Sequence, residues 1–235
     1  MGVIETRRAR RRRPGRSSVP RGSDPRVIRT RAAVIGAAQE LFLSRGFAGT
    51  TMDDIAAAAG LTKRTLYNNF PDKNALFTEI VTAVIAQAET FAQGLHEELA
   101  GTTAADLVPR LHDLGERLAL GILRPEVVTL RRLVIGESRE FPSLAAEYFD
   151  RAPGQVLEAL ASAFARLGAD GLLRVDQPRL AAAHFAYLVA GESLDRAVLV
   201  GTPPSKATLR VHARAGVETF LARYAAPRRR RTPAS

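Results

Sequence analysis

Apolar residues recur at intervals of three and four along most of this chain, from Val27 onward. Alternation with a period of two, which marks a half-buried β-strand, does not persist anywhere in that stretch. Because an α-helix repeats every 3.6 residues, this spacing places the apolar side chains on one face of each of several helices. Alanine and leucine, both strong helix formers, dominate the same stretch. The sequence therefore predicts an all-α protein.

Two long helices are expected in the first hundred residues. The first spans about 27–45, where one stripe is formed by Ile28, Ile35, Ala38 and Phe42. Gly46 followed by Phe47 predicts a left-handed C-cap with its hydrophobic contact. The second spans about 72–99 and carries a longer apolar face, formed by Phe77, Ile80, Val81, Val84, Ala88, Phe91 and Leu95. Its length suits a connector between a small N-terminal module and a larger second one.

Further helices follow, separated by proline-containing segments. We expect them near 104–121, 125–139, 143–151, 154–168, 177–200 and 205–224. Pro109 requires a kink or a later start in the first of these, and Pro153-Gly154 predicts a break. Asp176 is the expected N-cap of the helix near 177–200.

The positive charge of the chain is unevenly distributed. The formal net charge is +10, but nine arginines lie within residues 1–26 and Arg228 to Arg231 add four more, so residues 27–227 are nearly neutral. Residues 1–25 and 226–235 have few apolar side chains, which predicts a disordered arginine-rich arm and a basic disordered tail. Two interpretations of these arms stay open: solvated chain, or segments that follow DNA phosphates.

Residue usage argues against several classes of protein. The chain has no cysteine, which excludes disulfides and thiolate metal sites, and its four histidines show no paired ligand spacing. No glycine-rich phosphate loop or Ser-His-Asp arrangement is visible, so we expect no enzyme, no metal and no cofactor. No apolar run approaches the ~20 residues that span a bilayer. The arginines of 7–13 are not followed by an apolar segment, so we expect a cytoplasmic protein without a secretory signal or membrane partner.

Residues 51–70 have the pattern of two short helices joined by a tight turn. Thr51 and Asp54 fit a capping box at the start of the first helix. Gly60 provides the positive φ that the turn requires, and Thr62 caps the second helix. The segment therefore predicts a helix-turn-helix, within a domain that we place at 26–75.

The second helix of this segment divides into an inner and an outer face. Leu66 and Phe70 are four residues apart and point to the core. The outer side chains are those of Lys63, Arg64, Thr65, Tyr67, Asn68 and Asn69. In a major groove, arginine or lysine pairs with guanine, asparagine with adenine, and the threonine methyl group contacts thymine. Thr51, Tyr67 and Lys73 are better placed for phosphate oxygens. We therefore predict a double-stranded DNA interface that comprises Thr51, Thr62, Lys63, Arg64, Thr65, Tyr67, Asn68, Asn69 and Lys73.

This pattern resembles the TetR family of transcriptional regulators over about 27–85. The matching residues are Thr50-Thr51, Ile55-Ala56, Ala59-Gly60-Leu61-Thr62, Leu66-Tyr67-x-Asn69-Phe70 and Lys73. The histidine that the family usually has before the phenylalanine is Asn69 here, so any phosphate contact at this position must come from an amide. The resemblance implies a sequence-specific regulator, bacterial and nucleoid-associated when bound to DNA, that represses from a pseudo-palindromic operator until an effector releases it.

The remainder, about 76–225, resembles the family in its helical architecture and in the runs 137–148 and 171–178. The resemblance implies a domain that binds a small-molecule effector and forms a homodimer through the last two helices, about 177–200 and 205–224. Stripes suited to that interface are formed by Leu180, His184, Tyr187, Gly191, Leu194 and Val198, and by Leu209, Gly216, Val217, Phe220 and Tyr224. Candidate pocket residues are His112, Phe141, Phe164, His184 and Phe185, although each also fits an ordinary core or surface position. We expect an uncharged or weakly charged hydrophobic effector.

A second class of function fits part of the same pattern. A non-specific architectural protein that binds DNA through its arginine-rich tails would have equal affinity for unrelated duplexes. It would also be indifferent to Arg64→Ala, whereas a specific regulator would lose roughly 1–3 kcal/mol of binding free energy.

Overall fold

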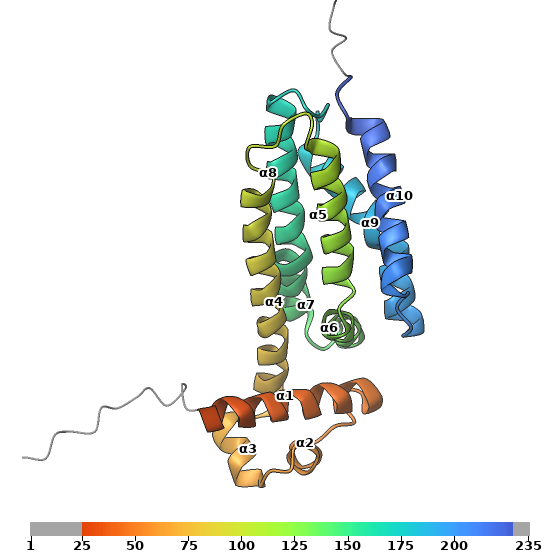
Figure 1. Ribbon diagram of the computed structural model, residues 1–235. Coiled ribbons are helices and arrows are strands. Elements are labelled where there is room, and N and C mark those ends of the chain that lie inside the picture. The colour runs from red at the N-terminus through yellow and green to blue at the C-terminus, as the bar shows by residue number, and fades with distance from the viewer. Residues whose placement is uncertain (1–24, 228–235) are drawn as a thin grey trace, which may run out of the picture.

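The computed structural model describes residues 25–227, so both arginine-rich arms lie almost wholly outside the described residues. Within that range the chain forms helices α1 to α10 and one π-helical turn. The described residues form no β-strand, and the one isolated β-bridge among them joins Leu173 to Ala225. The all-α prediction is confirmed. Figure 1 shows a small head of three helices at one end of an upright helical bundle.

The head consists of α1 (Pro25–Arg45), α2 (Met52–Ala58) and α3 (Lys63–Asn69). α1 buries Val34, Ala38 and Phe42, whereas Ile28, which we expected on the same stripe, is 55% exposed. The predicted C-cap is present: Gly46 has a φ of +76°, and its N–H donates to the Phe42 carbonyl at 2.9 Å.

The connector predicted over 72–99 is α4 (Lys73–Glu98), which runs from the head along the whole bundle (Figure 1). Over Lys73–Leu95 this helix is long and apolar enough to cross a membrane by length and composition, so our expectation that no such run exists was wrong. Its apolar residues are used inside the protein, however. Phe77, Ile80 and Ile85 are buried in the core of the head, and Leu95 is buried in the core of the bundle.

The bundle contains the helices that follow α4. They are α5 (Leu107–Ile122), α6 (Pro125–Gly136), α7 (Pro142–Phe149), α8 (Gln155–Ala169), α9 (Pro178–Val200) and α10 (Lys206–Tyr224). Its centre is filled by large side chains, among them Leu111, Leu160, Phe164, Phe185 and Phe220. α9 packs on three other helices of the bundle, α8, α10 and α5.

Three local predictions are resolved by the structure. α5 starts later than expected, at Leu107, so that Pro109 falls in its first turn, where a missing N–H costs nothing. Pro153-Gly154 does not break the chain, because a π-helical turn over Asp150–Gly154 carries α7 directly into α8. The N-cap of α9 is Gln177 rather than Asp176, and it makes no side-chain capping bond.

The head and the bundle share a hydrophobic core. We placed the domain boundary at residue 75, but the cluster around Phe42 and Leu66 continues along α4 and takes in Leu130 and Leu133 of α6. The Phe47 N–H also donates to the Glu137 carboxylate at the end of α6, at 3.1 Å. The head is therefore fixed to the bundle through two helices, α4 and α6.

Candidate nucleic-acid interface and ligand cavity

The capping box of α2 is formed as predicted. Thr51 Oγ1 accepts from the Asp54 N–H at 3.1 Å, and the Thr51 N–H donates to Asp54 Oδ2 at 3.0 Å. The Thr51 hydroxyl also donates to the same carboxylate oxygen at 2.6 Å. These hydrogen bonds occupy the Thr51 side chain, which we assigned to a DNA phosphate, and the residue remains exposed at the helix N-terminus.

The Thr51 hydrogen bonds lower the pKa of Asp54, with a smaller contribution from the charge of Arg45. Because the folded-state pKa is depressed, this contribution to stability is present above the unfolded pKa and is lost as pH falls through the folded value. We expect Thr51→Val to move the Asp54 pKa upward, as measured by an NMR pH titration of its carboxyl carbon. Thr82→Val, which removes a hydroxyl bonded to the Thr78 carbonyl, is the matched control. An unchanged Asp54 pKa in Thr51→Val would contradict this assignment.

The turn between α2 and α3 has the predicted geometry. Gly60 has a φ of +67°, and the Leu61 N–H donates to the Ala56 carbonyl at 2.9 Å. Thr62 then caps α3 by accepting from the Thr65 N–H at 3.2 Å. Leu66 is fully buried and holds α3 against the hydrophobic core of the head. The orientation of α3 is thus set by caps and by its core contact.

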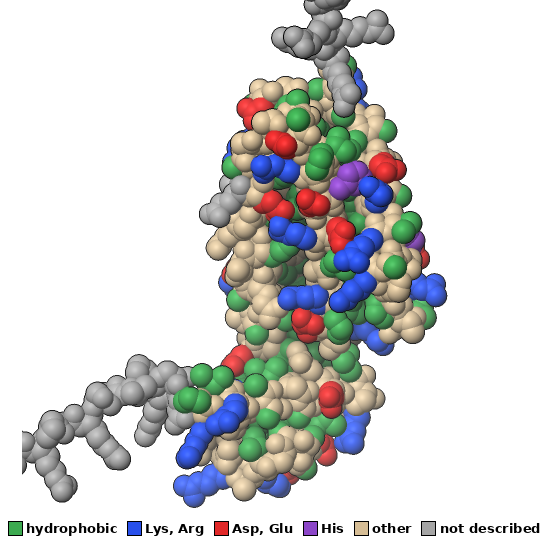
Figure 2. Space-filling model, in the orientation of Figure 1, with side chains coloured by type: hydrophobic (Ala, Val, Ile, Leu, Met, Phe, Trp, Pro, Cys, Tyr) green, Lys and Arg blue, Asp and Glu red, His purple; other side chains and the backbone are tan. Residues whose placement is uncertain are grey.

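The polar side chains that we predicted on the outer face of α3 differ in exposure: Thr65 is half-buried, with Oγ1 2.9 Å from Thr62 Oγ1. Arg64 and Asn68 are exposed, and neither has a hydrogen-bond or ion-pair partner among residues 25–227, while Tyr67 is 50% exposed. Lys63 pairs with Asp53 of α2 at 2.5 Å, and that carboxylate raises the pKa of Lys63. Basic side chains are visible along the free end of the head in Figure 2. Arg64, Tyr67 and Asn68 are therefore the groups that α3 leaves free for a ligand.

Asn69, the departure from the family pattern, is turned back onto its own helix. Its Nδ2 donates to the Thr65 carbonyl at 2.8 Å, and its own carbonyl accepts from Arg31 Nη1 at 3.0 Å. Arg31 also pairs with Glu79 of α4 and lies over the Phe70 ring, 4.5 Å from its centroid. Sequence reasoning missed Arg31, because its partners lie 38 and 48 residues away.

Lys73, which we predicted to contact a DNA phosphate, makes its hydrogen bonds within the protein. Its ammonium donates to the carbonyls of Phe47 and Thr50 at 2.6 and 2.8 Å. It also lies 4.3 Å from the centroid of the Phe47 ring. All these partners belong to the segment between α1 and α2, so the first residue of α4 holds that segment in place.

We expect Lys73→Met to lower the free energy of unfolding by about 1–2 kcal/mol, because two carbonyls lose a charged donor. The salt dependence of DNA binding should be unchanged, since the ammonium faces the protein. Lys63→Met is the control with the opposite pattern: a smaller salt slope and little change in stability. Thermal denaturation and DNA titrations at several salt concentrations measure both quantities. A reduced salt slope for Lys73→Met at unchanged stability would instead support the predicted contact between Lys73 and a DNA phosphate.

A cavity of about 510 Å³ lies in the bundle, lined by residues of α4 to α9 and of the π-helical turn. Its walls are mainly apolar. Space is left where the lining side chains are small, at Ala88, Gly121, Ala186, Ala190 and Gly191. The surface in Figure 2 is hollowed between α4 and α5, with basic side chains beside the hollow.

None of the five predicted pocket residues lines this cavity. Phe164 and Phe185 are buried in the core, with their ring centroids 5.4 Å apart. Phe141 packs on Phe47 and Phe77 beside the head. The other two residues lie away from the cavity: His184 is exposed, with Nδ1 2.7 Å from the Tyr224 hydroxyl, and His112 is half-buried on α5. Large aromatic side chains fill space in a core, so they were poor markers of a void.

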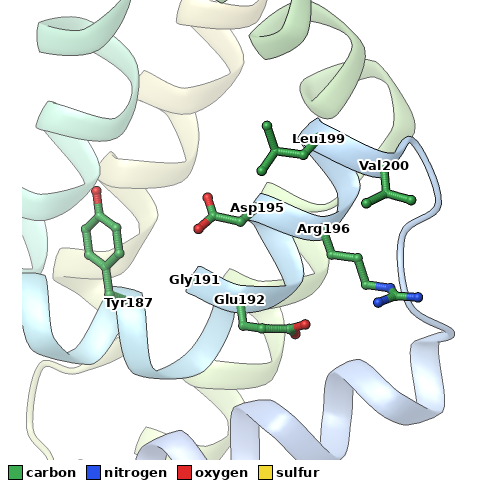
Figure 3. A pocket seen from close by; sticks show the side chains of 7 residues that line it. All are labelled: Tyr187, Gly191, Glu192, Asp195, Arg196, Leu199 and Val200. Atoms are coloured by element: carbon green, nitrogen blue, oxygen red, sulfur yellow. The ribbon is translucent and has the colours of Figure 1, made fainter.

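A second, shallow hollow lies on the outer side of α9. It is lined by Tyr187, Gly191, Glu192, Asp195, Arg196, Leu199 and Val200, all on this helix (Figure 3). Tyr187 and Leu199 are 67% and 81% exposed. Tyr187 and Gly191 line the inner cavity as well, so the two hollows share a wall.

Comparisons with known proteins agree with this architecture. Residues 34–80 match the family described as bacterial regulatory proteins, tetR family, and residues 109–226 match the C-terminal domain of AefR-like transcriptional repressors.

Individual relatives agree with these family matches. The chain is 33% identical over 172 residues to the probable HTH-type transcriptional regulator ArpR of Pseudomonas putida, which covers 68% of this chain and 76% of that protein. The match to the HTH-type transcriptional regulator EthR of Mycolicibacterium smegmatis is 34% identical and spans 32% of each chain.

A solved structure gives the same result for the fold. A TetR-family regulator from Mesorhizobium loti MAFF303099 superimposes with a TM-score of 0.73 and 32% identity, over 86% of this chain and 100% of that chain. The helix-turn-helix geometry of the head, the helical bundle and these matches lead to one conclusion. The chain belongs to the TetR family of bacterial transcriptional regulators.

Proposed function

We propose that this regulator is a repressor that reads a pseudo-palindromic operator with α3 and leaves it when a small molecule binds in the bundle. The observation that carries the DNA-binding role is the outer face of α3, where Arg64, Tyr67 and Asn68 are exposed on a helix held by its cap and by Leu66. A guanidinium and an amide match the hydrogen-bonding edges of guanine and adenine in a major groove. Rigid support matters because base readout requires these groups to be positioned before binding.

A homodimer through α9 and α10 would place two such helices on one side of the DNA. TetR-family regulators bind operator DNA and form dimers. Large exposed apolar side chains on these two helices support this interface: Leu180, Tyr187, Leu188, Leu199, Val200 and Val211. The residues that we expected to form the interface on α10 are not available for it: Leu209, Gly216 and Phe220 are buried within the single chain. Two recognition helices about 34–36 Å apart would then reach half-sites one DNA turn apart.

The cavity in the bundle is the site that we assign to the effector. Its volume of about 510 Å³ is in the range of small-molecule pockets. α4 and α6 both line it, and both also contribute to the core of the head. A ligand that favours one position of these helices would change the separation of the two heads, and by linkage it would bind the DNA-free form more tightly. Such a regulator would act in the cytoplasm, on nucleoid DNA.

Selection from random duplex DNA at moderate salt tests this function. The purified full-length protein should enrich a pseudo-palindrome with half-sites about one helical turn apart, about 10 base pairs. Enrichment of no sequence, together with equal affinity for unrelated duplexes, would reject the specific regulator and favour the architectural alternative.

A further inference from the structure

The charged side chains that line the cavity are of one sign. Its polar lining residues are Gln87, Thr90, Arg124 and Arg131, and the described residues around it include no aspartate or glutamate. The remaining lining is apolar or aromatic, with Phe91, Tyr148 and Leu157 among the larger side chains. The cavity therefore combines an apolar body with a positively charged side.

The positive side is one face of α6. Arg124, Val127 and Arg131 are spaced by three and four residues, so they share a face of this helix, and all three line the cavity. Leu130 and Leu133 of the same helix are buried in the core shared with the head, and Val127 packs against that core as well. α6 therefore presents two guanidinium groups to the cavity while it also contacts α1 and α4.

The two arginines differ in how far their charge is already compensated. Arg124 donates to Gln87 Oε1 at 2.7 Å and lies 3.4 Å from the Glu126 carboxylate, and it is exposed. Arg131 is half-buried, and no hydrogen bond, ion pair or ring contact joins it to any side chain or backbone group that the structure describes. A guanidinium beside an apolar cavity, with no counter-charge, is a site for an anion because desolvation strengthens the pairing.

We propose that the effector is an amphipathic organic anion whose carboxylate or other acidic group pairs with Arg131 while its apolar body contacts Phe91, Tyr148 and Leu157. This inference rests on the effector site proposed above and narrows it, since the sequence had led us to expect an uncharged or weakly charged ligand. Cationic amphipaths are disfavoured because they would meet two arginines and no carboxylate in the cavity. Neutral ligands of the same shape gain only the apolar contacts.

Two fluorescent probes with the same skeleton test the proposal on the full-length protein. They are 8-anilinonaphthalene-1-sulfonate, which is an anion, and N-phenyl-1-naphthylamine, which lacks the sulfonate. We expect Arg131→Gln to weaken binding of the anion about tenfold or more, because a charged hydrogen bond is lost, and to change binding of the neutral probe by less than about threefold. Arg131→Lys, which keeps the charge but loses the planar fork, should give an intermediate affinity for the anion.

Two further variants locate the probes. Ala88→Phe, which fills part of the cavity, should weaken both probes, whereas Lys206→Ala, at the exposed start of α10, should affect neither. Equal losses for the two probes in Arg131→Gln, or anion binding that Ala88→Phe leaves intact, would overturn the proposal. Operator binding is measured on the same samples. If the wild type binds its operator but takes up neither probe, the anion proposal fails while the regulatory function stands.

Discussion

Gly216→Ala is expected to lower the free energy of unfolding by about 3 kcal/mol, because it forces α10 away from α9 where their backbones meet. A Cβ built at Gly216 would lie 2.4 Å from the Leu188 carbonyl oxygen and 2.9 Å from the Val189 nitrogen. Both are backbone atoms of α9, so no side-chain rotation can relieve the contact. The whole of α10 would have to move away from α9, and the packing of Phe220 on Phe185 would be lost with it. Chemical denaturation followed by circular dichroism measures the loss.

A second glycine substitution provides the control. Gly36 lies inside α1, and a Cβ there would meet no heavy atom within 4 Å. Gly36→Ala should therefore stabilise the protein by about 0.5–1 kcal/mol, because alanine loses less backbone entropy in a helix. If Gly216→Ala left the free energy of unfolding as high as Gly36→Ala does, α9 and α10 could not approach each other as closely as the structure has them.

Arg64→Ala is expected to weaken operator binding by about 10- to 100-fold, which corresponds to roughly 1–3 kcal/mol for the loss of one base contact. Binding to unrelated duplex DNA should change far less, so the ratio of specific to non-specific affinity should fall. Fluorescence anisotropy with the selected operator and with a scrambled duplex measures both affinities. The melting temperature should stay the same, because Arg64 has no hydrogen-bond or ion-pair partner to lose among the described residues.

Its neighbour Lys63 gives a matched comparison on the same helix. Lys63 is paired with Asp53 rather than free, and a lysine is a weaker base reader than an arginine fork. Lys63→Ala should weaken operator and scrambled DNA alike and reduce the salt slope by about one. An equal loss on both duplexes for Arg64→Ala would assign that side chain to phosphate contact instead of base readout.

Much of the head was predictable from its sequence because its determinants are local. A capping box needs residues three apart, a left-handed turn needs Gly60 at one position, and an inner face needs Leu66 and Phe70 four apart. Each of these contacts joins residues within a few positions of one another, so spacing alone encodes them. The same locality explains why most helix limits agree with the structure to within a few residues.

The roles of individual side chains in the head were less predictable. Lys73 and Asn69 have the polarity of DNA-binding residues, but the first binds carbonyls 23 and 26 residues earlier and the second binds its own helix. Whether a cation is free or committed depends on which carbonyls the fold brings to it. Spacing in the sequence carries no such information.

The sequence by itself determined the helical class, the turn between α2 and α3 and the outward position of Arg64, Tyr67 and Asn68 on α3, because short-range backbone and capping preferences decide all three. Only the tertiary structure decided where the cavity lies, since its walls come from α4 to α9 and its volume is what their packed side chains leave unfilled. It also distinguished Arg131, which is half-buried and has no partner among the described residues, from the other described arginines that are paired or exposed. A void and an uncompensated charge are defined by what surrounds them, and those surroundings exist only after folding.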